Sequence, residues 1–166
     1  MFKKLFGKKE EVSKEESVFA PMKGKLVSLE EVPDPVFSQK MMGDGAAIIP
    51  SEGKVVSPVN GEIIQLFHTK HAIGLRSETG MELLIHVGLE TVGMNGEGFE
   101  AHVKEGDKVS VGDALLTCDL TLISEKASSI ITPIVITNGD ILESVEKAEP
   151  QETDLGKTEI FQVKAK

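Results

Sequence analysis

The sequence predicts an all-β protein, built as an antiparallel β-sandwich with one or two short helices. From Val18 onward, short apolar runs alternate with Gly, Pro and Asn, residues that end strands and form turns. The runs recur about every ten residues, which suits a sandwich or barrel better than alternating strands and helices. Only residues 120–129 and 139–148 show a helical pattern, and both stretches are short.

The expected strands follow one another through the body of the chain. Each is a short β-like run bounded by turn-forming residues. In chain order they are residues 24–29, 46–51, 54–59, 61–67, 71–77, 81–87, 108–111, 113–120, 131–137 and 159–165.

A weak internal repeat indicates that one β unit occurs twice. The stretches APMKGKL at 20–26 and SPVNGEI at 57–63 share the form small–Pro–x–x–Gly–x–aliphatic. Proline stops one strand and glycine permits a tight turn before the next, so each copy predicts a corner between strands. The stretch EGDKVSVGDALL at 105–116 repeats the same device of a polar turn between short strands. We therefore expect a barrel-sandwich hybrid with a duplicated hybrid motif.

Such corners also occur in biotinyl and lipoyl carrier domains, which provide a first alternative function. A carrier displays a modifiable lysine at the tip of a hairpin. The nearest stretch here is QKMMGDG at 39–45, but it lies too far from SPVNG and does not flank Lys40 correctly. The carrier function is therefore rejected.

Charge and cysteine content exclude several classes of protein. The chain has 166 residues and a net charge of −9, whereas a nucleic-acid binder needs a basic face to neutralise phosphates. The single cysteine, Cys118, cannot form an internal disulfide, and no apolar run approaches the ~20 residues that span a bilayer. These features predict an acidic, cytoplasmic, single-domain protein that binds no nucleic acid.

The first 17 residues differ from the rest and are expected to form a flexible basic and charged tail ahead of a domain at 18–166. Phe2, Leu5 and Phe6 lie among four lysines, and a charged spacer follows. The segment is too short and too interrupted for a signal peptide. Its alternative role is weak contact with an anionic membrane surface, the apolar side chains inserting while the lysines meet the headgroups.

Two of the four histidines flank one predicted hairpin, HAIGLRSETGMELLIH at 71–86. In an antiparallel hairpin, opposed residue numbers have a constant sum, which the loop sets. A loop of Glu78 and Thr79 gives a sum of 157 and places His71 opposite His86, whereas a loop of Thr79 and Gly80 gives 159 and makes them diagonal neighbours. Only an even sum without a compensating bulge would separate them. The apolar run around His86 favours neutral imidazole, the nucleophilic form.

Several stretches together resemble the glucose-type enzyme IIA of the bacterial phosphoenolpyruvate:sugar phosphotransferase system. They are PMKGKLVSLEEVPDPVFSQKMMGDGAAIIPSEGKVVSPVNGEI, HAIGLRSETGMELLIHVGLETV, GEGFEAHVKEGDKVSVGD and TPIVITN, in the family's order from about Val18 to the C-terminus. The resemblance implies a β-sandwich that accepts a phosphoryl group on a histidine from the carrier protein HPr. It also implies that the group passes to a cysteine of an enzyme IIB domain on a sugar permease.

The resemblance assigns roles to five residues around the hairpin. His86 in LLIHVG is the phosphorylated nucleophile, His71 is its partner that stabilises the phosphoryl group, and Thr69 orients His71. The family uses the ε2 nitrogen, so Nδ1 of His86 should be protonated and held by a backbone carbonyl, for which Gly88 is the candidate. Glu90 stands where the family often has Asp, which retains the charge with longer reach.

A second block predicts a surface for docking partners. The resemblance places an apolar rim around the histidines, with acidic groups that suit a basic partner. Core packing is the alternative for its phenylalanines. The residues assigned to this rim are Asp34, Val36, Phe37, Met42, Phe67 and Leu84.

Two further functions remain as alternatives. The chain could act mainly as a regulatory binding protein, whose partners are released when His86 phosphorylation adds about two negative charges to an apolar patch. No cofactor is required for the relay, but His71 and His86 could hold Zn²⁺ if a partner supplies a further ligand. A zinc hydrolase of the lysostaphin type is disfavoured because the chain has no His-x-His pair. His68 and His102 match no motif and are expected at the surface, and Cys118 is expected to be a buried strand residue.

Overall fold

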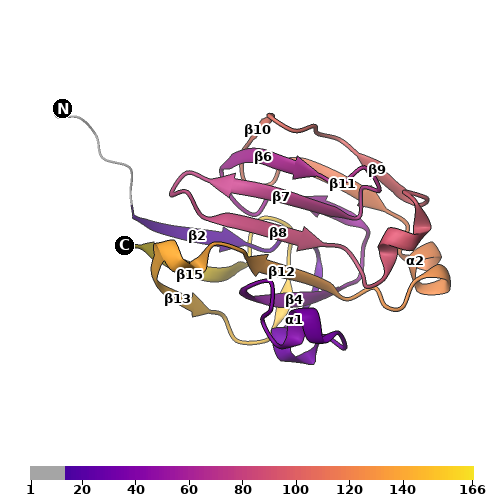
Figure 1. Ribbon diagram of the computed structural model, residues 1–166, viewed down its shortest axis with the longest axis horizontal. Helices are drawn as coiled ribbons and strands as arrows, with labels where there is room; N and C mark the ends of the chain where they lie inside the picture. Colours follow the sequence, from indigo (N-terminus) through magenta and orange to yellow (C-terminus); the bar gives the residue numbers. More distant parts are fainter. Residues whose placement is uncertain (1–13) are drawn as a thin grey trace.

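A computed structural model describes residues 14–166, and these form a mostly β protein with antiparallel sheets and two short α-helices. The basic part of the predicted tail, residues 1–13, lies outside the described residues. β2 (Glu15–Phe19) pairs with β15 (Glu159–Ala165) from Glu15 onward, so this strand begins ahead of the predicted domain start at residue 18. This pairing sets the two ends of the domain side by side (Figure 1).

Three antiparallel sheets make up the described part of the chain, residues 14–166. The largest has eight strands in the order β10 (Lys108–Val109), β6 (Gly61–Leu66), β7 (Ala72–Ser77), β8 (Glu82–His86), β12 (Thr132–Ile136), β4 (Asp44–Pro50), β3 (Gly24–Ser28) and β14 (Glu152–Thr153). A second contains β5 (Lys54–Val56), β11 (Ala114–Cys118) and β9 (Phe99–Ala101). The third contains β13 (Leu142–Lys147), β15 and β2.

Short helices occupy the connections between strands. The α-helices are α1 (Pro35–Ser38) and α2 (Leu120–Lys126), and the 3₁₀ turns are η1 (Leu29–Glu31), η2 (Thr91–Met94) and η3 (Gly139–Ile141). Among residues 14–166, no helix is long and apolar enough to cross a membrane. The predicted helix at 120–129 is confirmed by α2, whereas α1 was not predicted from the sequence.

The predicted helix at 139–148 is wrong, because this stretch forms η3 and then strand β13. Leu142 and Val145 are both turned toward the core, and their spacing of three suits a helix. The register of β13 against β15 shifts between Leu142 and Ser144. This bulge lets two residues of odd spacing face the same side of a strand, and it produces the helical pattern.

The two corners of the predicted internal repeat share their local structure. Gly24 begins β3 and Gly61 begins β6, and a Cβ at either would overlap a carbonyl oxygen of the neighbouring strand. The two corners are also hydrogen-bonded to each other. Phe19 N donates to the Pro58 carbonyl at 2.9 Å, and Val56 N donates to the Pro21 carbonyl at 2.9 Å.

Apolar side chains cover both faces of the eight-stranded sheet. The main core lies between the sheets and includes Phe161, Met22 and Leu75, all fully buried. A smaller cluster covers the other face, where η1 and α1 pack against the sheet. Its members are Val27, Leu29, Val32, Phe37, Ala47, Ala72, Leu84, Leu89, Ile131 and Val135. The functional site described below borders this smaller cluster.

Candidate functional site

The hairpin β7–β8 brings His71 and His86 together, but in a register that the sequence did not predict. Ala72 pairs with His86 and Arg76 with Glu82, so opposed residue numbers add to 158 rather than to 157 or 159. The loop has three residues, 78–80, because Ser77 N donates to the Met81 carbonyl at 2.8 Å. Gly80 ends this loop at φ +93°, a conformation that glycine adopts without strain.

The two imidazole rings nevertheless touch, with centroids 4.9 Å apart and planes at 80°. His71 lies just before the first residue of β7, so the alternation of side chains along the strand does not apply to it. The preceding residue, Lys70, has φ +63°, which turns the backbone out of the extended conformation. Val87 N donates to the His71 carbonyl at 2.7 Å and holds this bend beside the end of β8.

His71 is buried, and Thr69 lies against it. The exposed fraction is 3% for His71 and 5% for Thr69, and Thr69 Oγ1 lies 2.6 Å from His71 Nδ1. The Phe67 ring packs against His71 at 5.4 Å, nearly edge-on. Burial, followed by the nearby His86 and His68, lowers the pKa of His71 to about 4. His71 is therefore neutral at pH 7.

His86 ends β8 and is half-buried, and its Nδ1 lies 2.8 Å from the Gly88 carbonyl oxygen. Because a carbonyl can only accept, the proton of the neutral ring is on Nδ1 and the lone pair on Nε2. Burial is the largest influence on His86 and lowers its pKa, against the opposing effects of the Gly88 carbonyl and Asp34. The structure thus brings His86 and the Gly88 carbonyl together, while the role predicted for this contact stays a prediction.

The backbone that carries the Gly88 carbonyl is fixed by contacts that the sequence did not reveal. Thr91, fully buried, donates its hydroxyl to the Val87 carbonyl at 2.7 Å. Leu89 N donates to the Ser129 carbonyl at 2.9 Å. Gly88 itself has φ +73°, and a Cβ there would lie 2.9 Å from the same Ser129 oxygen. No motif in the sequence marks Thr91 or Ser129 for this role.

Glu90 lies next along this loop and is exposed, at φ +63°, directly before η2. Lys70 and Glu90 thus both adopt the left-handed conformation, one on each side of the histidine pair. Non-glycine residues rarely adopt this conformation, and those that do gather at functional sites. Beyond Glu90, Val92 has an exposed fraction of 56% and was not predicted as part of the site.

A rim of α1 and the turn after it borders His86. We call Asp34, Val36, Phe37, Met41 and Met42 the α1 rim. Asp34 caps α1 by accepting from Val36 N at 3.0 Å, and the Phe37 ring lies 5.1 Å from His86. The exposed fractions of Val36, Met41 and Met42 are 39%, 69% and 39%. Met41 was not predicted for this rim, although it is its most exposed apolar member.

Three members of the predicted rim, Phe37, Phe67 and Leu84, are more enclosed than its exposed apolar members. Phe37 and Leu84 are buried, with exposed fractions of 4% and 7%, and Phe67 is half-buried. All three pack in or against the smaller apolar cluster. Phe37 and Phe67 also contact His86 and His71, so core packing and contact with the histidines occur together in the two phenylalanines. Phe37, Leu84 and Phe67 are thus largely enclosed, whereas Val36, Met41 and Met42 leave apolar surface exposed.

The remaining predictions concern metals and isolated residues. Within residues 14–166, no group of three or more His, Cys, Asp or Glu side chains is placed to hold a metal ion. His68 and His102 are exposed and Cys118 is buried, which confirms their predicted locations. Burial raises the pKa of the Cys118 thiol to about 12, with Asp119 adding to the effect.

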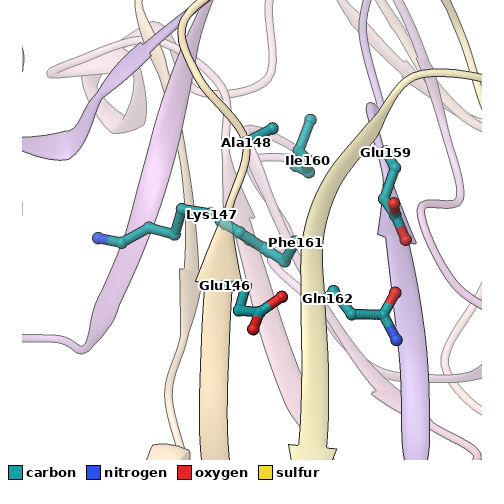
Figure 2. Close-up of a pocket in the computed structure, with 7 residues that line it drawn as sticks. All are labelled: Glu146, Lys147, Ala148, Glu159, Ile160, Phe161 and Gln162. Atoms are coloured by element: carbon teal, nitrogen blue, oxygen red, sulfur yellow. The ribbon is translucent and has the colours of Figure 1, made fainter.

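A pocket elsewhere on the molecule does not compete with this site. It lies between β13 and β15 and is lined by Glu146, Lys147, Ala148, Glu159, Ile160, Phe161 and Gln162 (Figure 2). Figure 2 shows Lys147 pointing away from Glu159 and Gln162, and its Nζ binds Asp44 Oδ1 at 2.7 Å. The pocket therefore offers carboxylates rather than cations, a poor environment for a phosphoryl group.

The fold and the site together define a β-sandwich protein with a paired-histidine surface site. The chain belongs to the family described as phosphoenolpyruvate-dependent sugar phosphotransferase system, EIIA 1, which matches residues 16–142. It is thus a phosphotransferase-system component that takes part in phosphoryl transfer during sugar uptake.

Named relatives agree with this assignment over the length of the chain. A PTS system glucose-specific EIIA component of Bacillus cereus is 59% identical over 166 residues, which is 100% of both chains. One from Halalkalibacterium halodurans is 58% identical over 170 residues, covering 99% of this chain and 98% of the relative. Among solved structures, glucose permease IIA from Mycoplasma capricolum has a TM-score of 0.85 and 37% identity, covering 90% of this chain and 96% of that one. These matches confirm the predicted family and fold class.

Proposed function

We propose that His86 accepts a phosphoryl group from phosphorylated HPr and passes it to a cysteine of a sugar-specific enzyme IIB. The observation that carries this proposal is the contact of 2.8 Å between His86 Nδ1 and the Gly88 carbonyl. It leaves the Nε2 lone pair as the nucleophile, beside the buried ring of His71. The names of the relatives favour glucose as the sugar.

In the proposed transfer the two histidines have separate roles. Nε2 of His86 attacks phosphorus in line with the bond to the donor, which breaks as the new P–N bond forms. If the Thr69 hydroxyl donates to Nδ1 of His71, the proton of neutral His71 is on Nε2 and can be donated to a phosphoryl oxygen. His71 then stabilises the transferring group without holding it as a full ion pair. The P–N bond on His86 stays reactive enough for onward transfer.

Partner binding is assigned to the α1 rim. Apolar surface is presented by Val36, Met41 and Met42. These residues are close in sequence to Phe37, whose ring contacts His86. Asp34 and the net charge of −9 favour a partner with a basic rim, which electrostatic attraction would steer to the site. Both HPr and enzyme IIB would use this surface in turn, and this role places the chain in the cytoplasm.

The test is phosphorylation by phosphoenolpyruvate, enzyme I and HPr. Wild type and His71→Ala should take up label and His86→Ala should not, and His71→Ala should pass it to enzyme IIB more slowly. His102→Gln is the matched control, because His102 is exposed and its Nε2 lies 2.6 Å from Thr117 rather than near the pair. Absence of label on wild type with a competent HPr would refute the relay.

A regulatory role is the second candidate, and the observation that favours it is the exposed apolar α1 rim beside the phosphorylation point. Phosphate on His86 would add about two negative charges next to this rim and release a partner that needs an apolar contact. Zinc belongs to the same proposal. The Gly88 contact leaves Nε2 of His86 free to bind a metal, and Nε2 of His71 can bind one only when its proton is on Nδ1, which then donates to the Thr69 hydroxyl. A partner would have to complete the four ligands that Zn²⁺ prefers.

A further inference from the structure

The two adjacent methionines that follow α1 differ from the other methionines in the described part of the chain. Met41 and Met42 have exposed fractions of 69% and 39%, whereas Met22, Met81 and Met94 do not exceed 7%. Susceptibility of methionine to oxidation follows exposure of its sulfur. We propose that Met41 and Met42 form an oxidation site for peroxides, and that their sulfoxides weaken docking of the phosphoryl donor. The second half of this proposal rests on the proposed function.

The location of the pair makes oxidation consequential. Met41 N donates to the Val36 carbonyl at 3.1 Å, so the pair lies one turn beyond the exposed start of α1. Lys40 N likewise donates to the carbonyl of Phe37, whose ring contacts His86. A sulfoxide oxygen here sits on the apolar surface that a partner must cover. Burying it without a hydrogen-bond partner opposes binding.

The backbone of the turn does not depend on the methionine side chains. Gly43 N donates to the Lys40 carbonyl at 3.2 Å, and Lys40 Nζ lies 3.5 Å from Glu30 and 3.7 Å from Asp44. Oxidation therefore changes the surface and leaves the fold in place. It should affect the concentration of donor needed for transfer rather than the melting temperature.

The chemistry is oxygen transfer from a peroxide. The sulfur lone pair attacks one peroxide oxygen and the O–O bond breaks. That oxygen stays on sulfur, and the other leaves as water when the oxidant is hydrogen peroxide. Sulfur is oxidised by two electrons and the peroxide is reduced by two. Cys118 does not compete, because it is 8% exposed and carries almost no thiolate at neutral pH.

The experiment compares wild type with the double variant Met41→Leu/Met42→Leu, each before and after treatment with hydrogen peroxide. Peptide mass spectrometry should show sulfoxide at Met41 and Met42 before Met22, Met81 or Met94. The initial rate of phosphate acceptance is then measured against phospho-HPr concentration. In wild type, KM should rise on the order of tenfold with little change in kcat. In the double variant, oxidation should change neither KM nor kcat. Because this variant retains Met1, it also controls for oxidation of that residue.

Each outcome separates this inference from the proposed function. Methionine sulfoxide reductases should restore the KM of oxidised wild type. An equal loss in the double variant, or a KM that does not change once both methionines are oxidised, would overturn the inference and leave the relay intact. If untreated wild type accepts no phosphate, the relay fails and the docking half fails with it. The order of sulfoxide formation still confirms or refutes the oxidation site itself.

Discussion

Replacing Thr69 with valine tests whether one hydroxyl orients the partner histidine. The substitution exchanges the hydroxyl for a methyl group of similar size, at a site with 5% exposure and 2.6 Å from His71 Nδ1. Because His71 is 3% exposed, its Nδ1 would be left buried without this partner. Leaving a buried polar group unpaired costs about 1–3 kcal/mol, so we expect the free energy of unfolding to fall by that amount.

The effect on phosphoryl transfer should be larger than the effect on folding suggests. Without the Thr69 hydroxyl, nothing in the site fixes the proton of His71 on Nε2, the atom that would meet the phosphoryl oxygens. Losing one preorganised donor costs about 10²-fold in rate, so transfer through Thr69→Val should slow by about 10- to 100-fold. Thr69→Ser, which keeps the hydroxyl, should stay within a few-fold of wild type.

The assays are urea unfolding and single-turnover transfer from phospho-HPr, together with long-range ¹H–¹⁵N NMR of the imidazoles. The NMR spectra should show His71 protonated at Nε2 in wild type and in Thr69→Ser. A Thr69→Val protein that is less stable but transfers phosphate at the wild-type rate would refute the orienting role. It would leave Thr69 with a structural role only.

Three further predictions follow from the same geometry. Gly88→Ala should lose about 2–4 kcal/mol of stability and most of its phosphate acceptance, because a Cβ at φ +73° would lie 2.9 Å from the Ser129 oxygen. Gly139→Ala, where a Cβ meets nothing within 4 Å, should keep the stability and the phosphate acceptance of wild type in the same assays. The contribution of His71 to stability should fall by ~3 kcal/mol as pH drops from 6.5 to 4, since unfolded His71 binds a proton at about 6.5 and the folded form, whose pKa burial lowers to about 4, does not. In urea titrations across this range, His71→Gln should show a flatter slope than wild type, and parallel slopes would contradict the assignment. Finally, Cys118 should resist iodoacetamide at pH 8 in the folded protein and react after unfolding, because burial raises the pKa of its thiol to about 12.

The regular part of the fold was predictable because its signals are local. At the corners 20–26 and 57–63, proline ends one strand, and glycine is needed because a Cβ would overlap the neighbouring strand. Both residue types can be recognised in a short stretch of sequence. The prediction for β13 was wrong because the pattern of its apolar residues depends on its pairing with a distant strand. The bulge between Leu142 and Ser144 exists only in its pairing with β15, so the spacing of apolar residues indicated a helix. The short strands β9 and β14 carry too few residues to give a pattern of their own.

The contact between the histidines illustrates a different limit. Alternation along the strands and the observed register together would have placed His71 on the face opposite His86. The rings meet because the chain leaves the extended conformation at Lys70, one residue before His71. On the other side, Gly88 and Glu90 turn the chain back so that the Gly88 carbonyl reaches His86 Nδ1. Lysine and glutamate are poor signals of left-handed backbone, so their conformation depends on the packing around them. The site therefore forms where the pairing of β7 with β8 ends, and its chemistry depends on backbone bends that the tertiary structure imposes.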